Sequence, residues 1–195
     1  LGDVYKRQVN PDIVHYCLDK LFELAYQDTL RIFETIPGQV TITYVAEDLG
    51  SQEGLLISRE HIRTFLLPRM RRMIDLAHGA GAYAFCHSDG AVREIIPDLL
   101  EIGIDVLNPV QWRCRGMDRR GLARDFGRDL VFHGAIDNQQ TMAFGTPEDV
   151  RREVKENIEI FRQATGYVVA PCHNLQPNTP TRNILALYEA VKEFG

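Results

Sequence analysis

Hydrophobic and polar residues follow two periods along this chain, and the two periods alternate. Short apolar or β-branched stretches, typical of buried strands, occupy residues 40–45, 82–86, 105–107, 130–135 and 167–171. Around them apolar residues recur every three to four positions, which predicts amphipathic helices over residues 10–35, 58–77, 92–102, 119–126, 147–166 and from 180 onward. Strands that alternate with helices in this way predict a parallel α/β sheet.

Proline and glycine mark several of the predicted helix ends. Asn10, Thr146 and Thr179 each precede a proline, which is the expected order of a capping residue and a first helical residue. Gly166 is expected to end the helix that starts after Thr146. Pro68 lies inside a predicted helix and should kink it, because proline removes one backbone donor and crowds the preceding turn.

Polar residues follow the C-terminal end of each predicted strand, where the active sites of (β/α)8 barrels collect. These residues are Glu47 and Asp48, His87 and Asp89, Asn108 and Gln111, Asp137 and Gln139, and His173, Asn174 and Gln176. Neither a G-x-G-x-x-G motif nor a phosphate-binding loop follows any strand, which disfavours a doubly wound nucleotide-binding sheet. We therefore predict a (β/α)8 TIM barrel, present here as a partial barrel of about five strand–helix units.

The chain ends suggest how this partial barrel arises. Residues 1–8 join no periodic segment and resemble the linker sequence that is translated at the broken ends of metagenomic gene fragments. We interpret residues 1–8 as a non-native tail and residues 9–195 as the C-terminal part of a single barrel domain. Five strands cannot close an eight-stranded barrel, which agrees with this interpretation.

Composition narrows the class of partner. Of 195 residues, 45% are hydrophobic and 25% are charged, as in ordinary globular proteins. The net charge of −5 disfavours nucleic acid and anionic membrane surfaces as partners. The sequence contains neither a membrane-length apolar run nor a signal peptide, and its four cysteines are too few for a disulfide framework. We expect a cytoplasmic protein that acts on a small molecule.

His87, Asp89 and His173 form the most specific set of candidate ligands. His87 and Asp89 are two residues apart at one strand end, so their side chains point the same way, and His173 follows another strand. Three protein ligands with an open fourth position are typical of catalytic zinc, although iron or manganese also suits two histidines and one carboxylate. His173 could instead form only a hydrogen bond in its loop, and Cys172 could take its place as a ligand.

Other polar residues are candidates for contacts with substrate. Asp48 could act as an acid or base or bind substrate together with Gln52, or it could cap a loop. Asn108, Gln111, Asp137 and Gln176 could line the pocket or form hydrogen bonds within their loops. His133 lies in mid-strand and is expected to be a satisfied core histidine, and Cys86 is expected to be a small buried hydrophobic residue.

Over residues 40–194 these features together resemble the uroporphyrinogen decarboxylase superfamily. The resemblance is carried by Glu47-Asp48-Leu49-Gly50-Ser51-Gln52, Leu56-Ile57-Ser58, His87-Ser88-Asp89-Gly90, Gly103-Ile104-Asp105-Val106-Leu107-Asn108-Pro109, His133-Gly134-Ala135-Ile136-Asp137, Gln176-Pro177-Asn178-Thr179-Pro180 and Asn183-Ile184-Leu185-Ala186. It implies a (β/α)8 barrel. It also implies one of two chemistries, metal-free decarboxylation of a tetrapyrrole or zinc-dependent methyl transfer between a corrinoid protein and a thiol or similar acceptor.

The methyltransferase branch carries His-x-Cys-Gly after one strand and a distant Cys after the last. By this resemblance His87 is the first zinc ligand, Asp89 stands where the branch has its cysteine, and His173 stands at the distant cysteine. A metal held without thiolates is a stronger Lewis acid, so the resemblance implies that the methyl donor or acceptor need not be a thiol.

Three hypotheses follow. The leading one is a metal-dependent methyltransferase that acts with a corrinoid partner, with His87, Asp89 and His173 on the metal and Asp48 catalytic. The alternative is a metal-free decarboxylase of the tetrapyrrole type. The third is an inactive fragment or interaction module, because five strand–helix units do not complete a barrel.

Overall fold

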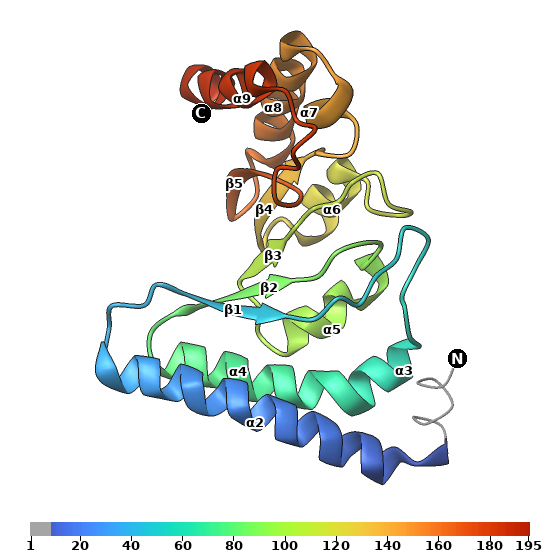
Figure 1. Ribbon diagram of the computed structural model, residues 1–195, viewed down its shortest axis with the longest axis vertical. Coiled ribbons are helices and arrows are strands. Elements are labelled where there is room, and N and C mark those ends of the chain that lie inside the picture. Colours follow the sequence, from blue (N-terminus) through green and yellow to red (C-terminus); the bar gives the residue numbers. More distant parts are fainter. Residues whose placement is uncertain (1–8) are drawn as a thin grey trace.

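Five parallel strands form one sheet in the order in which they occur along the chain (Figure 1). The computed structural model describes residues 9–195, and the predicted non-native tail at residues 1–8 lies outside them. The strands are β1 (Ile42–Ala46), β2 (Tyr83–His87), β3 (Val106–Asn108), β4 (Val131–Ile136) and β5 (Gly166–Pro171). Each strand pairs in parallel with the next, so the predicted parallel α/β class is confirmed.

Helices connect the strands and cover one side of the sheet. They are α2 (Pro11–Thr35), α3 (Arg59–His61), η1 (Ile62–Leu66), α4 (Leu67–Gly79), η2 (Arg93–Ile95), α5 (Ile96–Glu101), α6 (Arg119–Phe126), α7 (Thr141–Phe144), α8 (Pro147–Phe161) and α9 (Thr181–Phe194). Helix α2 packs along α4 at one end of the sheet, and α8 packs on α9 at the other (Figure 1). No helix within residues 9–195 combines the length and the apolar character needed to cross a bilayer.

The two faces of the sheet have opposite surroundings because successive side chains of a strand alternate. Cys86, Leu107 and Phe132 point toward the helices and are fully buried in the main hydrophobic core. The other face, which we call the inner face, carries Tyr44 and Phe85, whose rings stack at 5.5 Å. Large apolar side chains on this face remain exposed, among them Ile42, Tyr44, Tyr83 and Val168. The inner face also carries the polar side chains described below.

The helix predicted around Pro68 is interrupted by a π-helical turn just before the proline. Ser58 caps the helix by accepting a hydrogen bond from the His61 backbone N–H. The chain then makes the π-helical turn η1, in which the Leu67 N–H donates to the carbonyl of Ile62. Pro68 itself lies in the first turn of α4, where its missing N–H costs no helical hydrogen bond. The regular helix is therefore changed before Pro68, in the π-helical turn Ile62–Leu66, which holds one residue more than an α-helical turn.

Other predicted helix ends were correct only in part. Thr146 caps α8 as predicted, in a reciprocal pair with Asp149. Gly166 was placed wrongly, because α8 already ends at Phe161 and Gly166 is the first residue of β5. Thr179 does not cap α9, which begins after Pro180 without a side-chain cap.

Candidate active site

Three polar side chains on the inner face form a hydrogen-bonded chain across neighbouring strands. Asn108 at the end of β3 accepts a hydrogen bond from His87 Nδ1 at 2.6 Å and donates from Nδ2 to His133 Nδ1 at 2.7 Å. Because a carbonyl oxygen can only accept, Nδ1 of His87 is the donor in this bond, and Nε2 is the ring nitrogen left to face a metal. Burial lowers the pKa of His133, which favours its neutral form as the acceptor. Asn108 thus fixes the tautomer and the orientation of His87.

The free nitrogen of His87 belongs to a compact group of metal-capable side chains. Nε2 of His87 lies 3.9 Å from Oδ1 of Asp48, and one ligand atom each from Asp48, His87 and Asp89 lie within 4.8 Å of one another. The Asp89 backbone N–H donates to Asp48 Oδ1 at 3.3 Å, which ties the two acidic loops together. Two carboxylates and one imidazole are donors that divalent metals accept.

Asp89 carries a polar atom that lacks a protein partner. Its Oδ1 is buried and forms no hydrogen bond with any of the described residues. Burial raises the pKa of the Asp89 carboxyl. The neighbouring His87 lowers this pKa, whereas the carboxylate of Asp48 raises it. A buried carboxylate oxygen without a partner is costly unless a cation compensates it, so this group fits a metal ion.

Two glycines make this group possible by letting two loops touch. A Cβ on Gly90 would lie 2.5 Å from the Gly50 backbone, and Gly90 also has a φ of +87°. The Ala91 N–H donates to the Ser51 carbonyl at 2.7 Å, and the Gly90 N–H donates to Gln111 Oε1 at 2.7 Å. The glycine contact and the Ala91 hydrogen bond hold the β1–α3 loop against the β2–η2 loop and thereby bring Asp48 to Asp89, and Gln111 ties the β2–η2 loop to the β3–α6 loop.

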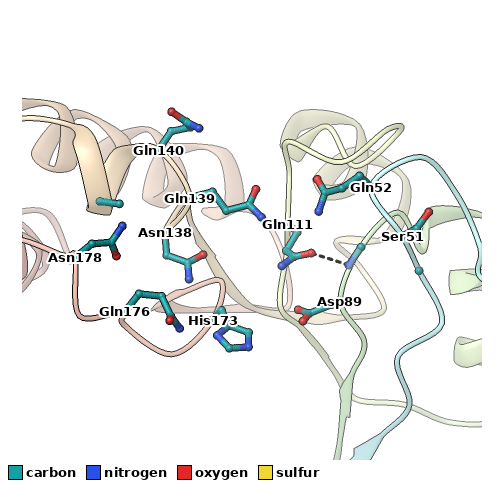
Figure 2. Close-up of a pocket in the computed structure, with 13 residues that line it drawn as sticks. Ser51, Gln52, Asp89, Gln111, Asn138, Gln139, Gln140, His173, Gln176 and Asn178 are labelled. Atoms are coloured by element: carbon teal, nitrogen blue, oxygen red, sulfur yellow. Dashed lines mark hydrogen bonds between the residues drawn. The ribbon is translucent and has the colours of Figure 1, made fainter.

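Two cavities adjoin the group. The first, which we call the amide cavity, has a volume of about 600 Å³ and contains Asp89 in its wall (Figure 2). The second, the aromatic cavity, has about 590 Å³ and is bounded by residues at the end of β5 and beyond it and by Tyr44, Phe85, His87, Asn108 and His133. His173 lies in the wall of both cavities.

The predicted site residues separate into those near the group and those away from it. Gln52, Gln111 and Gln176 line the amide cavity, where contact with a substrate was predicted. His173 is exposed on the cavity wall but lies outside the close group, in which Asp48 takes the third position. Its predicted role as a metal ligand therefore stays a prediction.

Asp137 faces its own loop. Its carboxylate accepts the backbone N–H groups of Gln139, Gln140 and Thr141 at 3.0–3.2 Å and pairs with Arg113. These bonds build the short helix α7, which sequence periodicity did not predict. The geometry favours a structural role for Asp137 over the predicted contact with substrate.

The two cysteines beside the ligands are buried thiols. Cys172 Sγ donates to the Val110 carbonyl at 3.1 Å, and burial raises the pKa of this thiol. A protonated thiol that is committed to a carbonyl is a poor metal ligand, which gives no support to Cys172 as the substitute for His173. Cys86 lies in the core as predicted, where burial raises its pKa to about 12.

Sequence reasoning missed His133 as part of the site. A mid-strand histidine looks like a core residue, and only the register of β3 and β4 reveals that Asn108 bonds it. Of the amides at residues 138–140 it placed only Gln139 at a strand end and missed Asn138 and Gln140, because polar residues in a loop carry no spacing signal. The position of these amides in the amide cavity depends on α7, a helix that the hydrophobic periodicity of the sequence does not predict.

The sequence of this chain is similar to those of known proteins. The chain is 30% identical over 177 residues to a methylated-thiol–coenzyme M methyltransferase of Methanosarcina mazei, a match that covers 87% of this chain and 44% of that protein. It is 25% identical over 192 residues to a uroporphyrinogen decarboxylase of Pseudomonas syringae pv. tomato, covering 95% of this chain and 50% of that one. The chain spans about half the length of the curated relatives it matches.

A solved structure of a methyltransferase from Methanosarcina mazei superposes with a TM-score of 0.77 at 21% identity. The match covers 99% of this chain and 53% of that one. This likeness supports the fold and confirms the predicted partial barrel. The sequence profile described as Uroporphyrinogen decarboxylase (URO-D) matches residues 8–194. The chain therefore belongs to the uroporphyrinogen decarboxylase family.

Proposed function

We propose that this protein is a metal-dependent methyltransferase that binds zinc or another divalent cation through Asp48, His87 and Asp89. The observation that carries the proposal is the partnerless buried Oδ1 of Asp89 within a group of three metal-capable side chains. His87 and Asp89 keep their predicted metal roles, and Asp48 joins them as a ligand in addition to its predicted catalytic role. His173, on the walls of both cavities, is the candidate for a fourth ligand.

The protein's own residues prepare this site in three ways. Asn108 holds the His87 Nδ1 proton, so that Nε2 is presented as a base without a tautomer change. Tyr44 stacks on His87 at 5.4 Å between ring centroids and restricts rotation of the imidazole. Gln111 holds the Gly90 N–H and so keeps the Asp89 loop in place. When bound, the cation would supply Lewis acidity toward the group that gives up or accepts the methyl.

The ligand set bears on the chemistry of the substrate. Two carboxylates and an imidazole are harder donors than thiolates, and they favour a hard oxygen or nitrogen group as the further ligand. We therefore propose that the methyl donor or acceptor binds through oxygen or nitrogen. We further propose that the methyl carrier is a corrinoid on a partner protein, as the resemblance to the methyltransferase branch implies.

A tetrapyrrole decarboxylase is the weaker candidate. A substrate with several acetate and propionate arms calls for cationic side chains around its binding site. Among the described residues, no lysine or arginine lies in the wall of either cavity. The match at 30% identity is also to a protein named as a methyltransferase, whereas the decarboxylase of Pseudomonas syringae is 25% identical.

Metal analysis of the purified protein tests the proposal. We expect stoichiometric zinc or another divalent metal, and loss of that metal in His87→Ala and Asp89→Asn. His61→Ala is the matched control, because His61 is a partly buried histidine on α3, away from the group. Absence of metal after exposure to a range of divalent ions, or full occupancy in Asp89→Asn, would refute the metal site.

Turnover separates the two chemistries once the metal is known. The proposed enzyme should remove the methyl group from a methylated corrinoid in the presence of an oxygen or nitrogen acceptor, followed by the change in corrinoid absorbance. Release of carbon dioxide from uroporphyrinogen, undiminished by chelators, would instead establish the decarboxylase.

A further inference from the structure

His133 brings a second imidazole to the inner face of the sheet. It lies in the middle of β4, where the preceding Phe132 is buried among the helices, so the side chain of His133 points the other way. The imidazole lies in the wall of the aromatic cavity, and its ring meets that of Phe85 edge-on at 5.0 Å between centroids. His133 is therefore placed to contact a molecule that occupies this cavity.

The orientation of the Asn108 amide decides which nitrogen of His133 carries a proton. Nδ2 of Asn108 lies 2.7 Å from Nδ1 of His133 and 3.3 Å from the backbone carbonyl oxygen of the same residue. A carbonyl oxygen only accepts, so the amide atom that faces it is the donor Nδ2 and not the amide oxygen. Nδ1 of His133 must then accept, which leaves the one proton of the neutral imidazole on Nε2. The lowered pKa of His133, which results from burial, agrees with a neutral ring.

The Nε2–H of His133 is the end of this hydrogen-bonded chain. The hydrogen bonds of His133 within residues 9–195 are those to Asn108 through Nδ1 and through the backbone carbonyl, and neither uses Nε2. The ring is partly buried and lies in the cavity wall, so Nε2–H can reach a molecule in the cavity. Because an N–H only donates, the group that it can bind is a hydrogen-bond acceptor.

The rest of the wall specifies the body of the ligand. Its apolar part contains Tyr44, Phe85, Leu175, Leu187 and Tyr188. Covering such side chains is favourable by about 25 cal/mol for each Å² of apolar surface removed from water. Among the residues that the structure describes, no carboxylate, lysine or arginine lines this cavity, so a charged group would lose hydration there without gaining a counter-charge. An uncharged, largely apolar molecule fits better.

We propose that His133 is a substrate-binding residue whose Nε2–H donates a hydrogen bond to an oxygen atom of an uncharged, largely apolar molecule in the aromatic cavity. The inference rests on the proposed function only in taking this molecule as the methyl donor or acceptor. His87 lines the same cavity, and its strand lies two strand spacings from that of His133, about 10 Å. A molecule that spans this distance reaches both the proposed metal at His87 and the donor at His133.

Two conservative variants separate contact with a ligand from support of Asn108. His133→Asn keeps a polar atom near the Nδ1 position, where it faces Asn108, and removes the donor at the Nε2 position. His133→Gln places an amide N–H near the Nε2 position and gives up the atom that faces Asn108. Binding of an oxygen-bearing ligand should therefore weaken in His133→Asn and be retained in His133→Gln. The free energy of unfolding should fall more in His133→Gln, because that variant leaves Asn108 Nδ2 without its imidazole partner.

A matched pair of probes measures this contact on metal-free protein. Acetophenone has a carbonyl oxygen beside an aromatic ring, and α-methylstyrene has a CH₂ group in place of that oxygen. By ligand-detected NMR, acetophenone should bind about fivefold more weakly to His133→Asn than to the native protein, which corresponds to the net value of one hydrogen bond. The affinity for α-methylstyrene should not change. His61→Asn, at a histidine on α3, is the control and should leave both affinities unchanged.

Two results would overturn the inference from probe binding. One is an unchanged affinity for acetophenone in His133→Asn, and the other is an equal loss for both probes. Tighter binding of benzyltrimethylammonium than of acetophenone to the native protein would also overturn it, because the cavity would then select a cation.

Nitrogen-15 NMR of the histidine rings tests the position of the proton directly. The signals that disappear in His133→Asn identify this residue, and they should show a neutral ring protonated on Nε2. A proton on Nδ1 of His133 would overturn the inference.

The outcomes keep this inference and the proposed function apart. Metal binding without the effect of His133→Asn on acetophenone would overturn the inference and leave the metal site intact. That effect in a protein that binds no metal would refute the metal site and support the inference.

Discussion

Replacing Asn108 by leucine removes the central link between His87 and His133 at nearly constant side-chain volume. Asn108 is 8% exposed and takes part in hydrogen bonds of 2.6, 2.7 and 3.3 Å. Each group left unpaired in the interior costs about 1–3 kcal/mol, and the lower end applies because both imidazoles are only partly buried and can regain water. We therefore expect a loss of about 2 kcal/mol in the free energy of unfolding for the two rings together.

The functional effect of the same change should exceed its effect on stability. Without the acceptor on Nδ1, the His87 ring can rotate and change tautomer, and loss of such a partner lowers metal affinity by about 10- to 100-fold. Asn108→Asp is the matched variant, because a carboxylate still accepts the His87 proton, so it should keep near-native metal affinity. Urea unfolding and competition with a chelating dye measure the two quantities. Native metal affinity in Asn108→Leu would refute the positioning role.

Three further predictions concern the loops and helices around the site. Asp98→Ala removes a buried carboxylate that pairs with two partly exposed arginines, and urea unfolding should show a loss of about 2 kcal/mol, whereas an unchanged midpoint would contradict it. Hydrogen bonds from Thr146 and Arg152 lower the pKa of Asp149 to about 2, so its contribution is present above the ordinary carboxyl pKa and is lost as the pH falls through 2. The stability difference between the native protein and Asp149→Asn, followed by thermal melts, should shrink from pH 4 to pH 2, and a constant difference would refute the cap. Gly90→Ala should lower the free energy of unfolding by at least about 3 kcal/mol, measured by thermal or urea unfolding. Gly54→Ala is the control, because Gly54 has open space around it, and it should show no such loss. Equal losses in the two variants would contradict the close contact between the loops.

The fold was predictable because its signals are local. The helix predicted at residues 119–126 coincides with α6, and the Thr146 cap lies where its proline and acids indicate. Strand ends differ by one or two residues, since pairing with a neighbour decides them. Helix α7 could not be predicted, because four residues show no period and the carboxylate of Asp137 organises them.

Only the part of the candidate site that depends on the spacing of residues along one strand could be predicted from the sequence. His87 and Asp89 share a strand end, so their proximity follows from the alternation of side chains. Asp48 enters the group through the contact between Gly50 and Gly90, which joins residues forty positions apart. Contacts between loops depend on the whole fold, and the position of His173 outside the close group has the same origin.

The inner face of the sheet also governs how this chain behaves once purified. Ile42, Tyr44 and Tyr83 are more than half exposed there, and β1 and β5 are edge strands within residues 9–195. Exposed aromatic surface and unpaired strand edges associate with any matching surface, their own copies included. The 195-residue chain produced by itself should therefore sediment as concentration-dependent oligomers. Such oligomers would form because copies of the chain bury this apolar face against one another. Their stoichiometry should therefore not be taken as that of the working enzyme.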